Sequence, residues 1–96
     1  MRFEWDENKR LINLQKHGID FADIWQVFDK DRRTIIDDRF DYGEIRFFTL
    51  GLIGNRVVAV SHTEINEVIR IISARKANKD EQTKFFKEIE NRLGES

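Results

Sequence analysis

The feature that most constrains this chain is the period of its apolar residues, which changes from helical spacing to alternation near residue 33. Beyond that point the pattern favours strands, and the turns between them are too short to hold a crossover helix. Gly54-Asn55 is a two-residue hairpin signal. The sequence therefore predicts strands over 33–37, 44–53, 56–63 and 68–74, the last three as an antiparallel meander.

The first thirty residues predict two helices. Asp6 is a fair N-cap for a helix over 7–16, and Gly18 falls just past its end. Asp20 caps the second helix. Its apolar residues recur at i, i+3, i+4 and i+7, and we expect all four to face the core: Phe21, Ile24, Trp25 and Phe28.

A third helix is predicted at the end of the chain. Asn78 and Glu81 stand three residues apart and approximate a capping box. The helix that they open carries its apolar residues on one side, and Gly94 ends it. Those apolar residues are Phe85, Phe86, Ile89 and Leu93.

A short alternating strand over 2–5 completes the order β-α-α-β-β-β-β-α. A chain of 96 residues supports one hydrophobic core, so residues 1–96 form a single domain. The predicted class is α+β, with helices packed on a mainly antiparallel sheet.

Composition narrows the setting of the protein. The chain has no cysteine, which excludes disulfides and thiolate zinc sites. Its first residues are polar and acidic, unlike a signal peptide, and its apolar runs are far shorter than a membrane helix. We expect a cytoplasmic protein that does not interact with a membrane.

Basic residues are concentrated in one place. Residues 70–79 contain four basic side chains and no acidic one, although the whole chain has a net charge of −1. The strip is either a solvated strand end or a rim that binds phosphate, because clustered cations attract anions even on a neutral protein. The overall charge argues against a general binder of duplex DNA.

Period-two spacing assigns faces to the candidate residues. His62 shares a face with Val58 and Val60, where it is either a buried structural residue or a proton carrier. Glu44 and Arg46 point the same way, as an ion pair or as a base held by a guanidinium.

The run from Ile69 to Lys76 is the sharpest local feature. Alternation places Ile69, Ile71, Ser73 and Arg75 on one face and Arg70 on the other. An arginine between apolar strand residues needs an internal partner or a cleft, and its planar fork matches phosphate. We find no metal-ligand spacing and no nucleotide-binding glycine loop, so we predict no metal and no cofactor.

These pieces together resemble the BrnT family of bacterial type II toxins, within the RelE/ParE-like superfamily. The resemblance covers nearly the whole chain. Its main segments are Phe3-Glu4-Trp5-Asp6-Glu7-Asn8-Lys9, Asn13, Lys16-His17-Gly18, Val27-Phe28, Gly43-Glu44-Ile45-Arg46, His62-Thr63-Glu64 and Ile69-Arg70-Ile71-Ile72-Ser73-Ala74-Arg75-Lys76-Ala77. The chain departs from the family pattern at Phe85, where tyrosine is common, and at Ile65, where arginine is common.

The resemblance implies a RelE-like fold and a ribonuclease-type toxin that blocks translation. It also implies a BrnA-like antitoxin with a ribbon-helix-helix part, which would neutralise the toxin and connect it to operator DNA. We expect the antitoxin to contact the sheet near residues 44–46 and 70–76.

The leading hypothesis is RNA cleavage without metal, in which the 2′-hydroxyl of RNA is the nucleophile. In this hypothesis the catalytic residues are Glu44, Arg46, His62, Arg70 and Arg75. The residues that bind RNA are Lys16, His17, Ser73, Lys76 and Lys79. Two alternatives stay open. One is a ParE-like toxin that poisons a protein target, and the other is a transcriptional accessory that acts only with its antitoxin.

Overall fold

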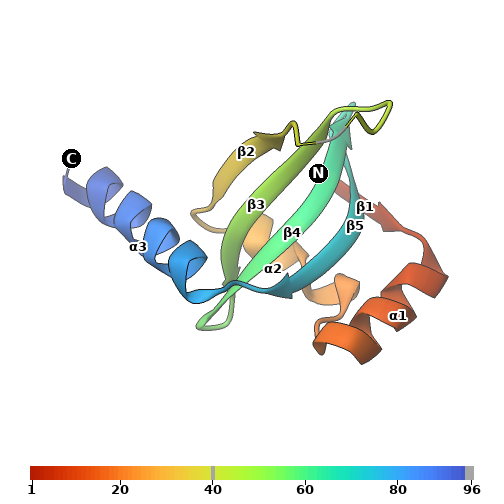
Figure 1. The fold of residues 1–96 in the computed structure, drawn as a ribbon, viewed down its shortest axis with the longest axis horizontal. Coiled ribbons are helices and arrows are strands. Elements are labelled where there is room, and N and C mark those ends of the chain that lie inside the picture. Colours follow the sequence, from red (N-terminus) through yellow and green to blue (C-terminus); the bar gives the residue numbers. More distant parts are fainter. Residues whose placement is uncertain (40, 95–96) are drawn as a thin grey trace.

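The fold comes from a computed structural model, which describes residues 1–39 and 41–94. Figure 1 shows one sheet with helices on both sides. The elements follow the predicted order: β1 (Arg2–Trp5), α1 (Glu7–His17), a 3₁₀ turn (Phe21–Asp23), α2 (Trp25–Phe28), β2 (Arg33–Asp37), β3 (Arg46–Ile53), β4 (Arg56–Ile65), β5 (Val68–Lys76) and α3 (Lys79–Gly94). The α+β prediction is confirmed.

The five strands form one sheet in the order β1-β5-β4-β3-β2. The predicted meander of β3, β4 and β5 is antiparallel throughout, and β1 pairs with β5 in parallel. The hairpin at Gly54-Asn55 is confirmed, because Ile53 pairs with Arg56 across it. The next turn uses two residues with positive φ, Asn66 and Glu67, as a tight two-residue hairpin requires.

Helix α1 begins and ends as predicted. The side chain of Asp6 accepts a hydrogen bond from the backbone N–H of Lys9, and Gly18 adopts a left-handed conformation at φ 71°. The Gly18 N–H then donates to the carbonyl of Leu14. A residue with a Cβ would be strained at this φ, so glycine ends the helix here.

The second helix is shorter than predicted, and the prediction that Trp25 faces the core is wrong. Asp20 caps a 3₁₀ turn, and only Trp25–Phe28 is α-helical. A 3₁₀ turn advances about 120° per residue instead of 100°, so it rotates the positions that follow it. Trp25 is therefore 51% exposed. Val27 is buried instead, in the core position that the helical spacing predicts for Trp25.

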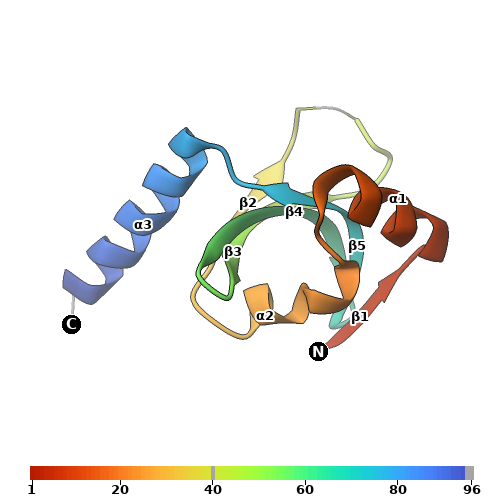
Figure 2. The same ribbon diagram turned by 90° about the horizontal axis from the view of Figure 1, so that it is seen from below.

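Two apolar clusters lie on opposite faces of the sheet. Helix α2 lies on the concave face (Figure 2), where its side chains pack with Val58, Val60 and Ile71. A smaller cluster on the convex face joins Leu50 and Ala59 to Phe85 of α3. The part of the convex face that α3 leaves uncovered carries Arg46, Arg70 and Arg75, and we call it the arginine face.

Only the first half of α3 packs as predicted. The capping box is confirmed, since Asn78 and Glu81 exchange hydrogen bonds between side chain and backbone N–H. Phe85 is buried and Ile89 packs at the edge of its cluster. Phe86 and Leu93 are 51% and 70% exposed, so the prediction that they share the buried side is wrong. The helix diverges from the sheet toward its C-terminal end (Figure 1), and these two side chains stay exposed.

A β-bulge changes the predicted faces of β5. Ser73 pairs with Ser61 and Ile71 with His62, so Ile72 is an extra residue without a partner on β4. The bulge reverses the alternation for every residue after it. Arg75 therefore lies on the same face as Arg70, and the prediction that they point to opposite faces is wrong.

Candidate functional site

Three arginines lie on the arginine face, from two strands that β4 separates. Arg70 pairs in register with Thr63 and Arg75 with Ala59, and these two partners point to the same side of β4. Arg46 precedes Phe48 by two residues and shares its side of β3. Because β-strands rise about 3.3 Å per residue and the partners on β4 are four residues apart, Arg70 and Arg75 are about 13 Å apart along the sheet.

A single carboxylate joins two of the arginines. Glu44 lies just before β3, and its Oε1 accepts a hydrogen bond from Arg70 Nη2 at 3.0 Å. The same oxygen is 3.5 Å from Nε of Arg46. The Arg46 guanidinium also stacks 3.9 Å above the ring of Tyr42, which fixes its plane. The predicted pairing of Glu44 with Arg46 is confirmed. Arg70 also pairs with Glu44, but its side chain is 48% exposed, so the expectation that burial forces this pairing is wrong.

Arg75 forms the second part of the site. Its guanidinium makes a two-pronged contact with Glu81, at 2.8 and 3.0 Å, and lies 5.8 Å above the ring of Phe48. These hydrogen bonds lower the pKa of Glu81 and raise that of Arg75. The pair is therefore fully charged at neutral pH, and Arg75 is held in one orientation.

A cavity of about 230 Å³ opens beside Arg75, between β2 and the start of α3. Arg39 and Arg75 both line it, over a floor that includes Ile35 and Phe48. Arg39 is bound by Asp37 through two side-chain hydrogen bonds, at 2.9 and 3.0 Å. This ion pair lowers the pKa of Asp37 to about 2.

The structure adds four residues to the site that the sequence did not predict there: Asp37, Arg39, Tyr42 and Glu81. Asp37 and Arg39 are two residues apart, which is a weak signal that also describes many solvated turns. Glu81 stands out in the sequence as part of the capping box, without any indication that it contacts Arg75. Its contact with Arg75 depends on the turn between β5 and α3, which no local pattern reveals.

Small hydroxyl side chains lie between the two groups of arginines. Ser61 and Ser73 pair in register on the arginine face, and Ser73 is exposed. Thr63 follows in the next row of the sheet, beside Arg70. These short side chains leave room above the sheet for an extended ligand between Arg70 and Arg75.

His62 lies on the opposite face, inside the larger core. It is 0% exposed, its Nε2 is 2.7 Å from Oγ1 of Thr49, and its ring packs against Phe28 and Phe47. Burial lowers its pKa to about 4, since desolvation disfavours the charged ring. The sheet separates His62 from the arginines, so we leave it out of the proposed chemistry and assign it a structural role.

The remaining predicted residues lie outside the arginine face. Lys16 and His17 occupy the last turn of α1, which packs on β5 and the 3₁₀ turn. Lys76 and Lys79 lie where β5 ends and α3 begins. Each of these two lysines lines a hollow beside Phe86.

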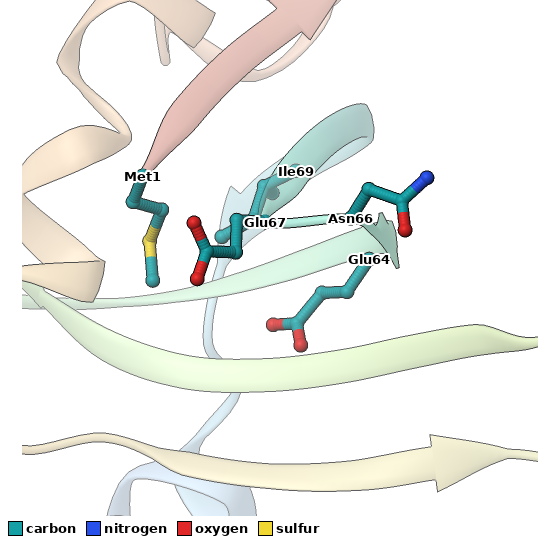
Figure 3. A pocket seen from close by; sticks show the side chains of 5 residues that line it. All are labelled: Met1, Glu64, Asn66, Glu67 and Ile69. Carbon is teal, nitrogen blue, oxygen red and sulfur yellow. The ribbon is translucent and has the colours of Figure 1, made fainter.

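Another hollow, of about 460 Å³, lies at the turn between β4 and β5 (Figure 3). Its lining includes the carboxylates of Glu64 and Glu67, whose side chains extend to the same side as Met1 in Figure 3. Carboxylates repel phosphate, so this hollow does not suit a polyanion. Among the described residues, no group of three or more His, Cys, Asp and Glu side chains could hold a metal ion.

One family model matches most of the chain. Residues 5–81 match the model described as the ribonuclease toxin BrnT of a type II toxin–antitoxin system. The chain belongs to this family. The matched range contains Glu44, Arg46, Arg70, Arg75 and Glu81, and so includes both parts of the arginine face. A search of curated proteins found no match.

Membership of the family settles the general activity. BrnT proteins are ribonuclease toxins of type II toxin–antitoxin systems, and a toxin of this type has a cognate antitoxin. The predicted family and toxin class are thereby confirmed. No helix in residues 1–39 and 41–94 is long and apolar enough to span a membrane.

Proposed function

We propose that the protein is a metal-independent endoribonuclease whose arginine face binds and cleaves RNA. The observation that supports this most is the convergence of Arg46 and Arg70 on Glu44, on a face that also presents Arg75. Guanidinium groups match phosphate in shape and charge, and a carboxylate between them can accept a proton. RNA carries its own nucleophile, the 2′-hydroxyl. The protein has only to position this group, remove its proton and stabilise the charge that develops on the phosphate.

The proposed step begins when phosphate displaces Glu44 from Arg70. Glu44 takes the proton of the 2′-hydroxyl, and the 2′-oxygen attacks phosphorus. The bond from phosphorus to the 5′-oxygen breaks, and that oxygen takes a proton from solvent, which reaches this exposed face. Arg46 and Arg70 stabilise the charge that develops on the phosphoryl oxygens.

Arg75 would bind a neighbouring phosphate of the same strand. Its distance from Arg70 along β5 suits contacts to different nucleotides, with Ser73 on the path between them. The predicted RNA contacts of Lys16, His17, Lys76 and Lys79 stay predictions, since these side chains stand apart from the arginines.

The decisive experiment measures cleavage of RNA by purified variants. Arg46→Ala, Arg70→Ala and Arg75→Ala should each lower the rate by about 10²–10³-fold, because each removes an oriented cation. Arg92→Ala is the matched control, since the Arg92 side chain is 43% exposed against 42% for Arg75 and lies near the end of α3. If the three folded variants cleave as fast as the parent, these residues are not the site.

Two further measurements test the details. Cleavage should continue in excess EDTA, and a rate that falls with EDTA and returns with Mg²⁺ would contradict a metal-independent mechanism. Cuts within circular RNA should appear, because an endonuclease needs no free end. A purified toxin that cuts no RNA but inhibits a protein target would favour the ParE-like alternative instead.

We further propose that RNA cleavage by this protein inhibits translation in the cytoplasm. The proposed antitoxin is BrnA-like, with a ribbon-helix-helix part through which the complex would bind operator DNA. A reading frame of that pattern beside the gene, and growth rescue when both are expressed, would support this pairing.

A further inference from the structure

The outer side of α3 presents a half-exposed aromatic side chain, Phe86. Phe86 is 51% exposed, although its ring contacts Phe85 edge-on. Hollows of about 390 and 560 Å³ lie beside it, one toward the hairpin of β3 and β4 and one along α3. An exposed aromatic between two hollows is typical of an anchor for a partner.

Basic side chains surround Phe86. Four line the two hollows, against one acidic side chain, Glu90. None of the four forms an ion pair within the described ranges: Arg56, Lys76, Lys79 and Lys87. By contrast, Arg46, Arg70 and Arg75 each pair with a carboxylate. The surface around Phe86 therefore carries uncompensated positive charge.

This surface crosses the end of the matched range, which includes Arg56, Lys76 and Lys79. The family match ends at residue 81, whereas Phe86, Lys87 and Glu90 come after it. The matched range already contains the whole proposed cleavage site. The proposed cleavage chemistry therefore does not use this part of α3, which leaves it available for a separate contact.

The apolar residues favour a protein over RNA as the occupant. Phe86, Ile89 and Leu93 follow one another at i, i+3 and i+7, the spacing with which one helix packs on another. Phe86 and Leu93 are exposed, and Ile89 forms the boundary with the buried cluster. A base can stack on Phe86, but Leu93 offers it no stacking surface.

We propose that this surface binds an acidic, amphipathic helix of the cognate antitoxin. Apolar residues of that helix would cover Phe86 and enter the hollows, and its carboxylates would pair with Arg56 and Lys87. The surface is separate from the arginine face, so binding here anchors the antitoxin without itself filling the cleavage site.

The test is the affinity of the toxin for the antitoxin encoded beside it, measured by calorimetry with purified proteins. Phe86→Ala should weaken binding about tenfold or more, as loss of a central aromatic does. Trp25→Ala is the matched control, because Trp25 is also 51% exposed and lies in α2, on the concave side of the sheet. Lys87→Ala should weaken binding and reduce its dependence on salt, whereas Lys84→Ala, whose side chain pairs with Asp80, should do neither.

Each outcome decides the proposal. Phe86→Ala and Lys87→Ala should keep the parent's rate of RNA cleavage and its melting temperature while losing antitoxin affinity. Unchanged antitoxin affinity in both folded variants would overturn the proposal. Loss of affinity for single-stranded RNA with antitoxin binding intact would overturn it too and assign the surface to RNA. A parent protein that cuts no RNA would refute the proposed function, yet the binding test would still apply.

Discussion

The side-chain amide of Asn13 completes the edge of β5 at Ala74. Its Nδ2 donates to the Ala74 carbonyl at 2.8 Å, and its Oδ1 accepts from the Ala74 N–H at 3.1 Å. Strand β1 pairs with β5 only as far as Ile71, so Asn13 replaces a strand at a position that β1 does not reach. The same Nδ2 donates to the carbonyl of Ile19, which ties α1, the following loop and β5 together.

Asn13→Ala should therefore destabilise the fold strongly. The substitution leaves buried backbone groups of Ala74 without partners, at a cost of about 2–4 kcal/mol. Chemical denaturation would measure the loss. Asn8→Ala, on the exposed side of the same helix, should change the free energy of unfolding by less than about 0.5 kcal/mol. Equal effects at the two positions would contradict the role of Asn13.

Gly51→Ala should destabilise the fold by overpacking. A Cβ at Gly51 would lie 2.6 Å from Cγ1 of Val27, where β3 supports α2. Val27 is fully buried, so relief requires a shift of the helix, and we expect a loss of about 1–3 kcal/mol. Gly94→Ala adds a methyl group that meets no atom within 4 Å, and it should leave the melting temperature nearly unchanged.

His62 should make stability depend on pH in the acid range. Its pKa is about 4 in the folded protein against 6.5 when unfolded, so the unfolded chain binds more protons between these values. The free energy of unfolding should fall by up to about 3 kcal/mol as the pH drops from 6.5 to 4. His62→Gln should remove most of this slope, whereas His17→Gln should keep it. A parent protein with equal stability at pH 6.5 and 4 would contradict the buried, neutral state of His62.

Glu44→Gln should separate chemistry from binding. The amide keeps the size of the side chain but cannot accept a proton, so cleavage should fall by about 10²–10⁴-fold. RNA affinity should stay the same or rise, because a neutral side chain competes less with phosphate for Arg70. Glu90→Gln, on the exposed side of α3, is the control for the loss of one negative charge. An unchanged rate in Glu44→Gln would assign the proton transfer to another group.

Asp37→Asn should lower the free energy of unfolding at pH 4 and above, and should have little effect near pH 2. The folded pKa of Asp37 is about 2, below its ordinary value of 3.8, because Arg39 binds the charged form. This stabilisation is present above pH 4 and is lost as the pH falls toward 2. The variant and the parent should thus differ at pH 6 and converge near pH 2. Asp38→Asn, next to it and exposed, should match the parent at both values.

Features set by neighbouring residues were predicted well. The caps at Asp6, Gly18 and Asn78, the hairpin at Gly54-Asn55 and the order of elements all depend on short segments, whose preferences are local. The pairing of Glu44 with Arg46 was also predicted, because residues two apart in an extended segment point to the same side. Trp25 was misplaced because a 3₁₀ turn and an α-helix share the same apolar spacing over a few residues.

The sequence by itself determined which elements form, in which order, and that basic residues gather near the end of β5. Only the tertiary structure decided that Arg75 joins Arg70 on one face, that Glu81 holds Arg75, and that His62 lies behind the sheet. The physical reason is that alternation is a local rule, whereas a bulge appears only when two strands are paired. One unpaired residue, Ile72, reverses the side on which every later side chain of β5 lies.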